Sequence, residues 1–399
     1  MAGNLVVGQA GGATAVINAS LAGVVEQAQR SGRFSTVWGM RRGAEGALAG
    51  DYIDLSRVAP AQLPAVAATP GAILGSSRHK LDDEEAESVL ADLIRRDVRA
   101  FLYIGGNDSA DTVHRLAQLA AARGYDLSAI AVPKTIDNDI PETDHCPGYG
   151  SIARYVANAT LDSAQDTESM PTMYPVKFIE VMGRDAGWVA ASAGLAAPDP
   201  TSPPHLIYMP EFPLSRQDVL ADVERVYREH GYVVAVVAET VRDETGAPFA
   251  DPGVSAEVDA FGHPLLRGTA DTLVRLVQAE LGLRARFDKP GSLQRMSSRF
   301  VSPIDRAEAE EVGRAAVRLA LNEMTDCMVS IIRATDEPYT SATSYVPLAN
   351  VANRQRLVPE EYVTADRRGV SEAFRRFALP LLGAGALPHY VHLRDLVPA

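Results

Sequence analysis

Short runs of apolar, β-branched residues recur along this chain, and segments with helical periodicity separate them. One such segment opens with four carboxylates at 82–85, which suit a helix N-terminus, and then places Val89, Leu90 and Leu93 on one face. Strands that alternate with helices form βαβ units, which build mostly parallel sheets covered by helices on both faces. The sequence therefore predicts an α/β fold of mostly parallel sheets flanked by helices. The predicted strands are residues 5–7, 36–38, 100–104, 129–132, 176–181, 206–209 and 233–237.

The size and charge of the chain exclude several classes of protein. Its 399 residues correspond to two or three domains at about 150 residues each. With 51 acidic and 38 basic residues, its net charge of −13 does not attract nucleic acid or anionic lipid. The longest apolar run, residues 232–238, is far shorter than the roughly 20 residues of a membrane helix. No export signal is recognisable and two cysteines cannot form a disulfide framework, so we expect a cytoplasmic protein without nucleic-acid or membrane partners.

The loop after the first predicted strand is rich in glycine. In parallel sheets, ligands bind beyond the C-terminal ends of the strands, so these loops are the first candidates for a site. Gly11 and Gly12 would let backbone N–H groups approach a phosphate at the start of the next helix. A tight strand-to-helix turn accounts for the same glycines, and the loop matches neither a Walker loop nor a dinucleotide fingerprint.

A second loop, Gly105-Gly106-Asn107-Asp108-Ser109, follows the predicted strand at 100–104 directly. Ser109 is expected to cap the helix that follows. An ordinary capped turn needs fewer polar groups than this loop contains. Two glycines with an amide and a carboxylate therefore indicate ligand or metal binding.

A third loop, residues 133–139, closes the strand that ends at 132. Asp137 and Asp139 stand two residues apart beside Thr135 and Lys134. This combination could supply a general base and a contact to metal or substrate, although solvated turns are also rich in Asp and Asn. A fourth candidate is Arg184, which follows the strand at 176–181 and could clamp a phosphate or stabilise transferring charge.

Taken together, these loops resemble those of the phosphofructokinases, from about residue 5 to residue 306. The resemblance implies two α/β domains and transfer of a phosphoryl group to the 1-hydroxyl of fructose 6-phosphate. The donor domain would comprise residues 1–148 and 296–345, and the sugar-phosphate domain residues 149–295 and 346–399. The matching motifs are Gly11-Gly12 with Asn18, Gly75-Ser76-Ser77-Arg78, Gly105-Gly106, residues 135–139, Met182-Gly183-Arg184, Glu239 and Gln294-Arg295.

The resemblance also assigns a role to each matching residue. Asp137 would be the general base, supported by Asp139 and Thr135, and Arg184 would stabilise the transferring group. The expected donor-binding residues are Gly11, Gly12, Arg78, Gly105, Gly106 and Ser109. The expected sugar-phosphate residues are Thr135, Asp137, Lys177, Met182, Gly183, Arg184, Glu239, Arg286, Ser292 and Arg295.

Two departures from the common pattern concern the donor. Members of the family that use ATP carry small glycines where this chain has Asp108 and Lys134, and the two larger residues resemble the pyrophosphate-dependent branch. The expected function is therefore reversible phosphoryl transfer from pyrophosphate to fructose 6-phosphate, with Asp108 and Lys134 counted among the catalytic residues. The alternatives are an ATP-dependent 6-phosphofructokinase, a pyrophosphate-dependent sedoheptulose 7-phosphate kinase and a non-catalytic regulatory subunit.

Further departures concern the metal, the acceptor and the assembly. Asn107 stands where a metal-binding Asp is usual, but Mg²⁺ remains the expected cofactor because pyrophosphate itself binds it. Ser292 stands where His or Tyr is common, which leaves the acceptor sugar open. Pro175 replaces an Arg that a neighbouring subunit often supplies, and Lys177 on the same strand face would substitute for it in a homodimer or homotetramer. Leu21 and Val25 replace effector-binding arginines, so no control by nucleotide or phosphoenolpyruvate is expected through that site.

Overall fold

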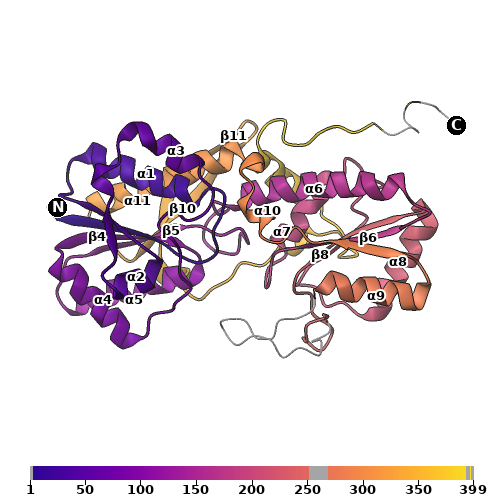
Figure 1. Ribbon diagram of the computed structural model, residues 1–399, viewed down its shortest axis with the longest axis horizontal. Coiled ribbons are helices and arrows are strands. Elements are labelled where there is room, and N and C mark those ends of the chain that lie inside the picture. The colour runs from indigo at the N-terminus through magenta and orange to yellow at the C-terminus, as the bar shows by residue number, and fades with distance from the viewer. Residues whose placement is uncertain (1–2, 251–267, 392–395, 397–399) are drawn as a thin grey trace. The chain divides into compact units, whose positions relative to one another are not determined.

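The computed structural model describes residues 3–250, 268–391 and 396, and the chain forms two compact units (Figure 1). Unit 1 consists of Met1–Ile152 and Gly291–Val358, and unit 2 of Ala153–Pro290 and Pro359–Ala399. Both units contain a sheet flanked by helices, which confirms the predicted α/β class. The assignment of one domain to the donor and the other to the sugar phosphate stays a prediction.

The sheet of unit 1 has seven strands, and its interior is parallel. In the order β11-β10-β5-β4-β1-β2-β3, the strands from β10 to β2 run parallel, while β3 and β11 are antiparallel edge strands. The central strands are apolar on both faces and almost fully buried, as expected for a sheet with two helical layers. The strands are β1 (Asn4–Gln9), β2 (Val37–Met40), β3 (Tyr52–Asp54), β4 (Val98–Gly105), β5 (Ser128–Pro133), β10 (Cys327–Asp336) and β11 (Tyr339–Pro347).

Two helical layers cover this sheet, and each encloses its own core. Successive side chains of a strand point to opposite faces, so Leu5 and Val7 of β1 pack in one core and Val6 in the other. On one face lie α1 (Ile17–Ser31), α3 (Leu63–Ala68) and α11 (Pro303–Leu321); on the other lie α2 (Gly43–Leu48), α4 (Asp83–Arg95) and α5 (Asn107–Ala122) (Figure 1). The acidic start predicted for the helix near residue 82 is confirmed, because Asp82 and Glu85 form a capping box at α4.

Unit 2 contains a four-stranded, wholly parallel sheet in the order β7-β8-β6-β9. Trp188, Tyr362 and Phe377 form an aromatic cluster that fastens the C-terminal segment to this unit. The strands are β6 (Val176–Val181), β7 (Leu206–Tyr208), β8 (Val233–Ala238) and β9 (Ala285–Asp288). The helices are α6 (Tyr149–Ser169), which begins in unit 1, α7 (Trp188–Ser192), α8 (Arg216–His230), α9 (Thr269–Leu281) and α12 (Glu372–Ala378), while the short α10 (Leu293–Met296) belongs to unit 1. Among the described residues, none of the helices has the length and apolar character required to cross a bilayer.

Candidate active site

Three of the predicted loops lie side by side in unit 1. They follow β1, β4 and β5, which are adjacent parallel strands, so all three leave the same edge of the sheet. Backbone hydrogen bonds join them in sequence: the Ala10 N–H donates to the Ile104 carbonyl at 2.9 Å, and the Lys134 N–H donates to the Gly105 carbonyl at 3.0 Å. These three loops therefore lie together at the C-terminal edge of a parallel sheet, where ligands bind in folds of this class.

Three cationic side chains surround the glycine loop after β1. Gly11 has a φ of 73°, which favours glycine, and a Cβ added to it would lie 3.3 Å from Lys134 Nζ. A Cβ on Gly12 would lie 3.0 Å from Arg295 Nη1 and 3.8 Å from Arg78 Nη2. The Lys134 ammonium donates a hydrogen bond to the Gly12 carbonyl at 2.8 Å. This arrangement, defined by Arg78, Lys134 and Arg295 around Gly11 and Gly12, is called the cation cradle below.

The electrostatics of the cation cradle favour an anion. Lys134 is only 3% exposed. Burial lowers the pKa of Lys134 to about 8, Asp137 acts in the opposite direction, and Arg295 and Arg78 lower it further. An anion placed among these groups would relieve the repulsion and keep Lys134 protonated. The cradle therefore has the charge and the backbone access that a phosphate compound requires.

The loop after β4 differs in one respect from its prediction. Helix α5 begins at Asn107 with Gly106 as its N-cap residue, so Ser109 lies inside the first turn and does not cap the helix. Ser109 instead packs against Gly105, where an added Cβ would collide with its hydroxyl oxygen. The prediction failed because the helix begins three residues earlier than the capping pattern indicated. The Asp108 side chain is 88% exposed, with its carboxylate 4.0 Å from Lys80 Nζ.

The loop after β5 alternates between accessible and buried residues. Thr135, Asp137 and Asp139 are partly exposed, whereas Ile136 and Asn138 are buried. The Asp137 N–H donates to the Thr135 hydroxyl oxygen at 3.1 Å. Burial raises the pKa of Asp139, although hydrogen bonds from Thr135 and Gln355 act against this rise. The loop thus brings both predicted carboxylates and the hydroxyl to its accessible side.

Asn107 supplies an oxygen next to these carboxylates. Its Nδ2 donates to Asp139 Oδ2 at 3.3 Å. Its Oδ1 is buried and has no hydrogen-bond partner among the residues that the structure describes. A buried acceptor without a partner carries a desolvation penalty, which a cation or a ligand donor would remove. The Asn107 side chain therefore offers an oxygen atom that a metal ion could bind.

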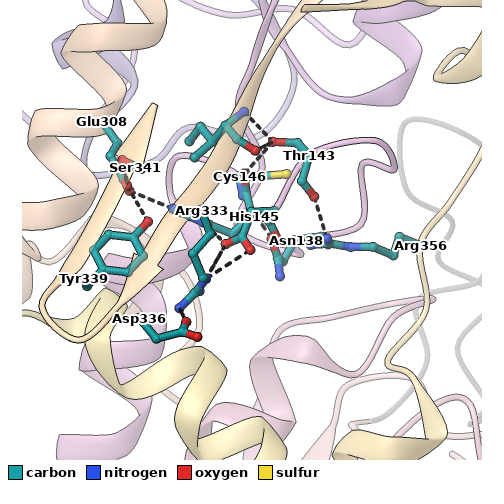
Figure 2. Close-up of polar contacts among 12 residues, drawn as sticks. Asn138, Thr143, His145, Cys146, Glu308, Arg333, Asp336, Tyr339, Ser341 and Arg356 are labelled. Atoms are coloured by element: carbon teal, nitrogen blue, oxygen red, sulfur yellow. Dashed lines mark hydrogen bonds and ion pairs between the residues drawn. The ribbon is translucent and has the colours of Figure 1, made fainter. Parts of the chain in front are cut away.

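Arg356 contacts this loop and was not predicted. Its guanidinium donates to the carbonyl oxygens of Asn138, Thr143 and Asp144 (Figure 2). Its own backbone N–H donates to the Asp139 carbonyl at 2.7 Å. The sequence offers no local signal for these contacts, because Arg356 lies in an irregular segment more than two hundred residues further along the chain.

His145 lies in a buried polar cluster at the far end of the same loop and was likewise not predicted. Its ring nitrogens are 2.8 Å from Asp144 Oδ2 and 2.7 Å from Glu308 Oε2 (Figure 2). Burial alone would lower the pKa of His145, but Glu308 and Asp144 outweigh it and raise the pKa to about 9. Tyr339 and Ser341 donate to Glu308 Oε1, each at 2.6 Å. At neutral pH His145 is therefore a buried, paired cation.

In unit 2, the fourth predicted loop lies beside the residue that follows the adjacent strand, β8. Met182, Gly183 and Arg184 follow β6, and Glu239 follows the adjacent parallel strand β8. Arg184 Nε lies 3.9 Å from Glu239 Oε1, and the Arg184 side chain is 56% exposed. Burial raises the pKa of Glu239, and Arg184 and a hydrogen bond from the Gly183 backbone act in the opposite direction. The structure thus brings Gly183, Arg184 and Glu239 together.

The remaining predicted sugar-phosphate residues lie elsewhere. Lys177 and Arg286 are register partners in β6 and β9, near the N-terminal ends of these strands and opposite the end that carries Arg184. Lys177 is buried, with its Nζ 3.0 Å from Asp288 Oδ2, and the Arg286 guanidinium lies over the Tyr174 ring. Ser292 precedes α10 and Arg295 lies within it, so both belong to unit 1. Within unit 1, Arg295 thus lies beside Gly12 of the predicted donor loop, and within unit 2, Lys177 and Arg286 lie at the end of the sheet opposite Arg184.

Comparisons of the sequence and of the structure with known proteins identify the same family. The phosphofructokinase family model matches residues 4–320. The chain is 41% identical over 394 residues to a pyrophosphate–fructose 6-phosphate 1-phosphotransferase of Halomonas elongata, which covers 97% of this chain and 93% of the relative. It is also 41% identical over 411 residues to the protein of that name in Xanthomonas campestris, covering 100% and 97%. A crystal structure of a pyrophosphate-dependent phosphofructokinase from Marinobacter aquaeolei matches with a TM-score of 0.87 and 36% identity, covering 98% of this chain and 94% of that one.

Proposed function

The chain belongs to the phosphofructokinase family, and on this premise we infer that it is a pyrophosphate–fructose 6-phosphate 1-phosphotransferase. The reaction moves a phosphoryl group from pyrophosphate to the 1-hydroxyl of fructose 6-phosphate, giving fructose 1,6-bisphosphate, in a readily reversible step. The observation that carries this inference is the cation cradle, in which buried Lys134 lies beside a glycine loop together with Arg78 and Arg295. A small, highly charged donor suits such a site better than a nucleotide does.

We assign the discrimination between donors to Lys134 and Asp108. Lys134 adds a charge-assisted contact to the phosphates of the donor. Asp108 places a carboxylate at the start of α5, where it would repel an additional phosphate group of a longer donor. This proposal makes ATP a poor donor, because one residue attracts pyrophosphate while the other disfavours the larger molecule.

We assign the general base to Asp137 and a supporting role to Asp139 and Thr135. The base must lie within hydrogen-bond reach of the hydroxyl proton, and the Asp137 side chain is on the accessible side of its loop. The Asp139 carboxylate accepts hydrogen bonds from the side chains of Asn107 and Gln355, both at Oδ2. These contacts hold the carboxylate in place and suit a positioning role.

In unit 2, Arg184 is our proposed electrostatic stabiliser of the transferred group. Its side chain is 56% exposed and lies 3.9 Å from Glu239 Oε1, so a ligand can reach its guanidinium. Glu239, with Met182 and Gly183, would contact the sugar. Phosphoryl transfer depends mainly on positioning and on neutralising negative charge, which this set of residues can provide.

The proposed cofactor is Mg²⁺. Within the described residues, no group of three or more His, Cys, Asp or Glu side chains could enclose a metal. Mg²⁺ is often held by one or two protein oxygens together with substrate phosphates, and the unpartnered Asn107 Oδ1 fits this mode. When bound, Mg²⁺ would neutralise charge on the pyrophosphate oxygens. Asn107 would hold it, with the Asp139 carboxylate nearby.

We further propose a homodimer or homotetramer in the cytoplasm. Lys177 and Arg286 lie at the opposite end of their sheet from Arg184, separated by most of the length of β6. Arg286, which is partly exposed, would contact a sugar phosphate bound at Arg184 in a second copy of the chain more easily than in its own. Lys177 would have to leave Asp166 and Asp288 to do the same. The free thiols of Cys146 and Cys327, both buried, are compatible with a reducing compartment.

One assay tests the function and its alternatives. Purified protein is incubated with Mg²⁺, fructose 6-phosphate and either pyrophosphate or ATP, and the bisphosphate product is measured in both reaction directions. We expect turnover with pyrophosphate and little with ATP. A preference for ATP would refute the assignment of the donor, and no turnover with either donor would favour a regulatory subunit. Comparison of kcat/KM for fructose 6-phosphate and sedoheptulose 7-phosphate then identifies the acceptor.

A further inference from the structure

We infer that Arg356 is a positioning residue for the loop that carries Asp137 and Asp139. This inference rests on the proposed function, because it concerns the two carboxylates assigned to phosphoryl transfer. It adds a residue from the segment after β11, which contains none of the sequence motifs described above. Arg356 acts through the backbone of the loop and contacts neither substrate nor metal in this proposal.

The guanidinium of Arg356 joins two parts of the loop. Its Nε and Nη2 donate to the carbonyl oxygen of Asn138 at 3.2 and 3.0 Å. Its Nη1 donates to the carbonyl oxygens of Thr143 and Asp144 at 2.7 and 2.8 Å (Figure 2). One side chain thus bridges the residue between the two aspartates and the opposite arm of the loop.

The backbone conformation and the burial of Asn138 explain why this bridge matters. It has a φ of 51°, a left-handed conformation that is uncommon for residues other than glycine, although asparagine tolerates it better than most. Its side chain is fully buried and its Oδ1 accepts a hydrogen bond from the Cys146 N–H at 3.0 Å. Without Arg356, the Asn138 carbonyl would lose both donors that the guanidinium supplies. A change in the backbone at Asn138 would rotate its neighbours Asp137 and Asp139 together.

The backbone around Arg356 also holds Asp139 directly. The Arg356 N–H donates to the Asp139 carbonyl at 2.7 Å, and Gln355 Nε2 approaches Asp139 Oδ2 at 3.4 Å. Arg356 and its neighbour therefore help to fix the position of this carboxylate.

The other end of the loop has independent anchors. His145 is paired with Glu308, and the Asp144 carboxylate accepts a hydrogen bond from Arg333 at 3.1 Å (Figure 2). These contacts fix residues 144–145 whether or not Arg356 is present. Loss of Arg356 is therefore expected to disturb the end that carries Asp137 and Asp139 and to leave the rest of unit 1 folded.

Only a planar group with several donors can make this bridge. Arginine presents five N–H donors in a fixed plane, whereas lysine has three donors on a single nitrogen and cannot span carbonyls on two sides. Lysine nevertheless keeps the positive charge. Arg356→Lys thus separates the geometry of the bridge from its charge, and Arg356→Met removes both. Arg354, exposed two residues earlier, is a matched control position.

The experiment compares kcat and both KM values for the wild type, Arg356→Lys, Arg356→Met and Arg354→Met. We expect kcat of Arg356→Met to fall about 10²-fold, because misplaced reacting groups cost rates of this order, while both KM values change by less than about threefold. Arg356→Lys should restore part of the loss. Arg354→Met should match the wild type.

Unchanged kcat in both Arg356 variants would overturn the inference, as would a loss confined to KM. If Arg356→Met does not fold, Arg356→Lys decides, since it must still show lower kcat. Amide hydrogen exchange of residues 135–139 gives a readout that does not depend on activity: it should be faster in Arg356→Lys than in Arg354→Met. If the wild type proves inactive with pyrophosphate, the proposed function fails, and this exchange comparison still tests the positioning of the loop.

Discussion

The lowered pKa of Lys134 makes the binding of pyrophosphate dependent on pH in a defined way. In the free protein, burial and the neighbouring arginines place this pKa at about 8, whereas an ordinary lysine has 10.5. Bound pyrophosphate would favour the protonated form and raise the pKa again. If it restores the ordinary value, the affinity should be about tenfold weaker at pH 9 than at pH 7, because binding at pH 9 requires uptake of about 0.9 proton.

Isothermal titration calorimetry tests this prediction. Titrations with pyrophosphate at pH 7 and pH 9, each in two buffers with different ionisation enthalpies, give the affinity and the number of protons taken up. The ionisation of pyrophosphate itself also changes across this range, so the comparison needs a matched variant. Lys134→Met should bind more weakly at pH 7 and should lose the proton uptake assigned to Lys134. Lys80→Arg removes a half-exposed, titratable lysine outside the cation cradle but keeps the positive charge beside Asp108, so it should keep the pH dependence of the wild type.

Two results would refute the reasoning. In the first, the affinities of the wild type and of Lys134→Met for pyrophosphate fall equally between pH 7 and pH 9. The second is no difference in proton uptake between them at pH 9. Either result would mean that Lys134 does not titrate in this range or does not face the donor.

Three further predictions concern the aspartates and the buried histidine. Asp137→Asn should lower kcat by about 10²- to 10⁴-fold with little change in the KM for fructose 6-phosphate, and a larger loss of kcat in Asp139→Asn would show that the base is misassigned. Asp108→Gly should increase turnover with ATP and weaken the pyrophosphate reaction; kinetics with both donors check this, and unchanged donor preference would contradict it. His145 has a folded-state pKa of about 9 against a usual 6.5, so its stabilising contribution is fully present below about pH 6.5 and is lost as the pH rises through 9. From pH 6 to pH 9, the free energy of unfolding measured with urea should therefore fall more in the wild type than in His145→Gln. Equal decreases would count against a charged His145.

Much of the fold could be predicted because the central strands are continuous apolar runs. All seven predicted strands are present, and β6 has the predicted limits. Strands β3, β9, β10 and β11 were not predicted. Strands β3 and β9 have only three and four residues, and β11 is an exposed edge strand rich in Ser and Thr. Their order in the sheet depends on packing against distant segments, which local periodicity does not encode.

The candidate site was predictable where its residues follow adjacent strands. Gly11, Gly105 and Lys134 meet because three parallel strands end at one edge. Arg356 and His145 were not predictable, since their partners are backbone carbonyls and carboxylates far away in the sequence. Such contacts leave no spacing pattern. They appear only when the course of the irregular segments is known.

The division of unit 1 into two stretches of chain has a consequence for the order of synthesis. Strand β10, which covers the outer side of β5, and Arg295 of the cation cradle both lie beyond residues 153–290, which belong to unit 2. At typical translation rates, the ribosome needs roughly 7–30 s to synthesise that intervening stretch. During this time β5 is an unpaired edge, which is prone to pair with other chains. Pyrophosphate cannot help to stabilise the first half of unit 1 on the ribosome, because the cradle that would hold it is completed only after unit 2 has largely been made.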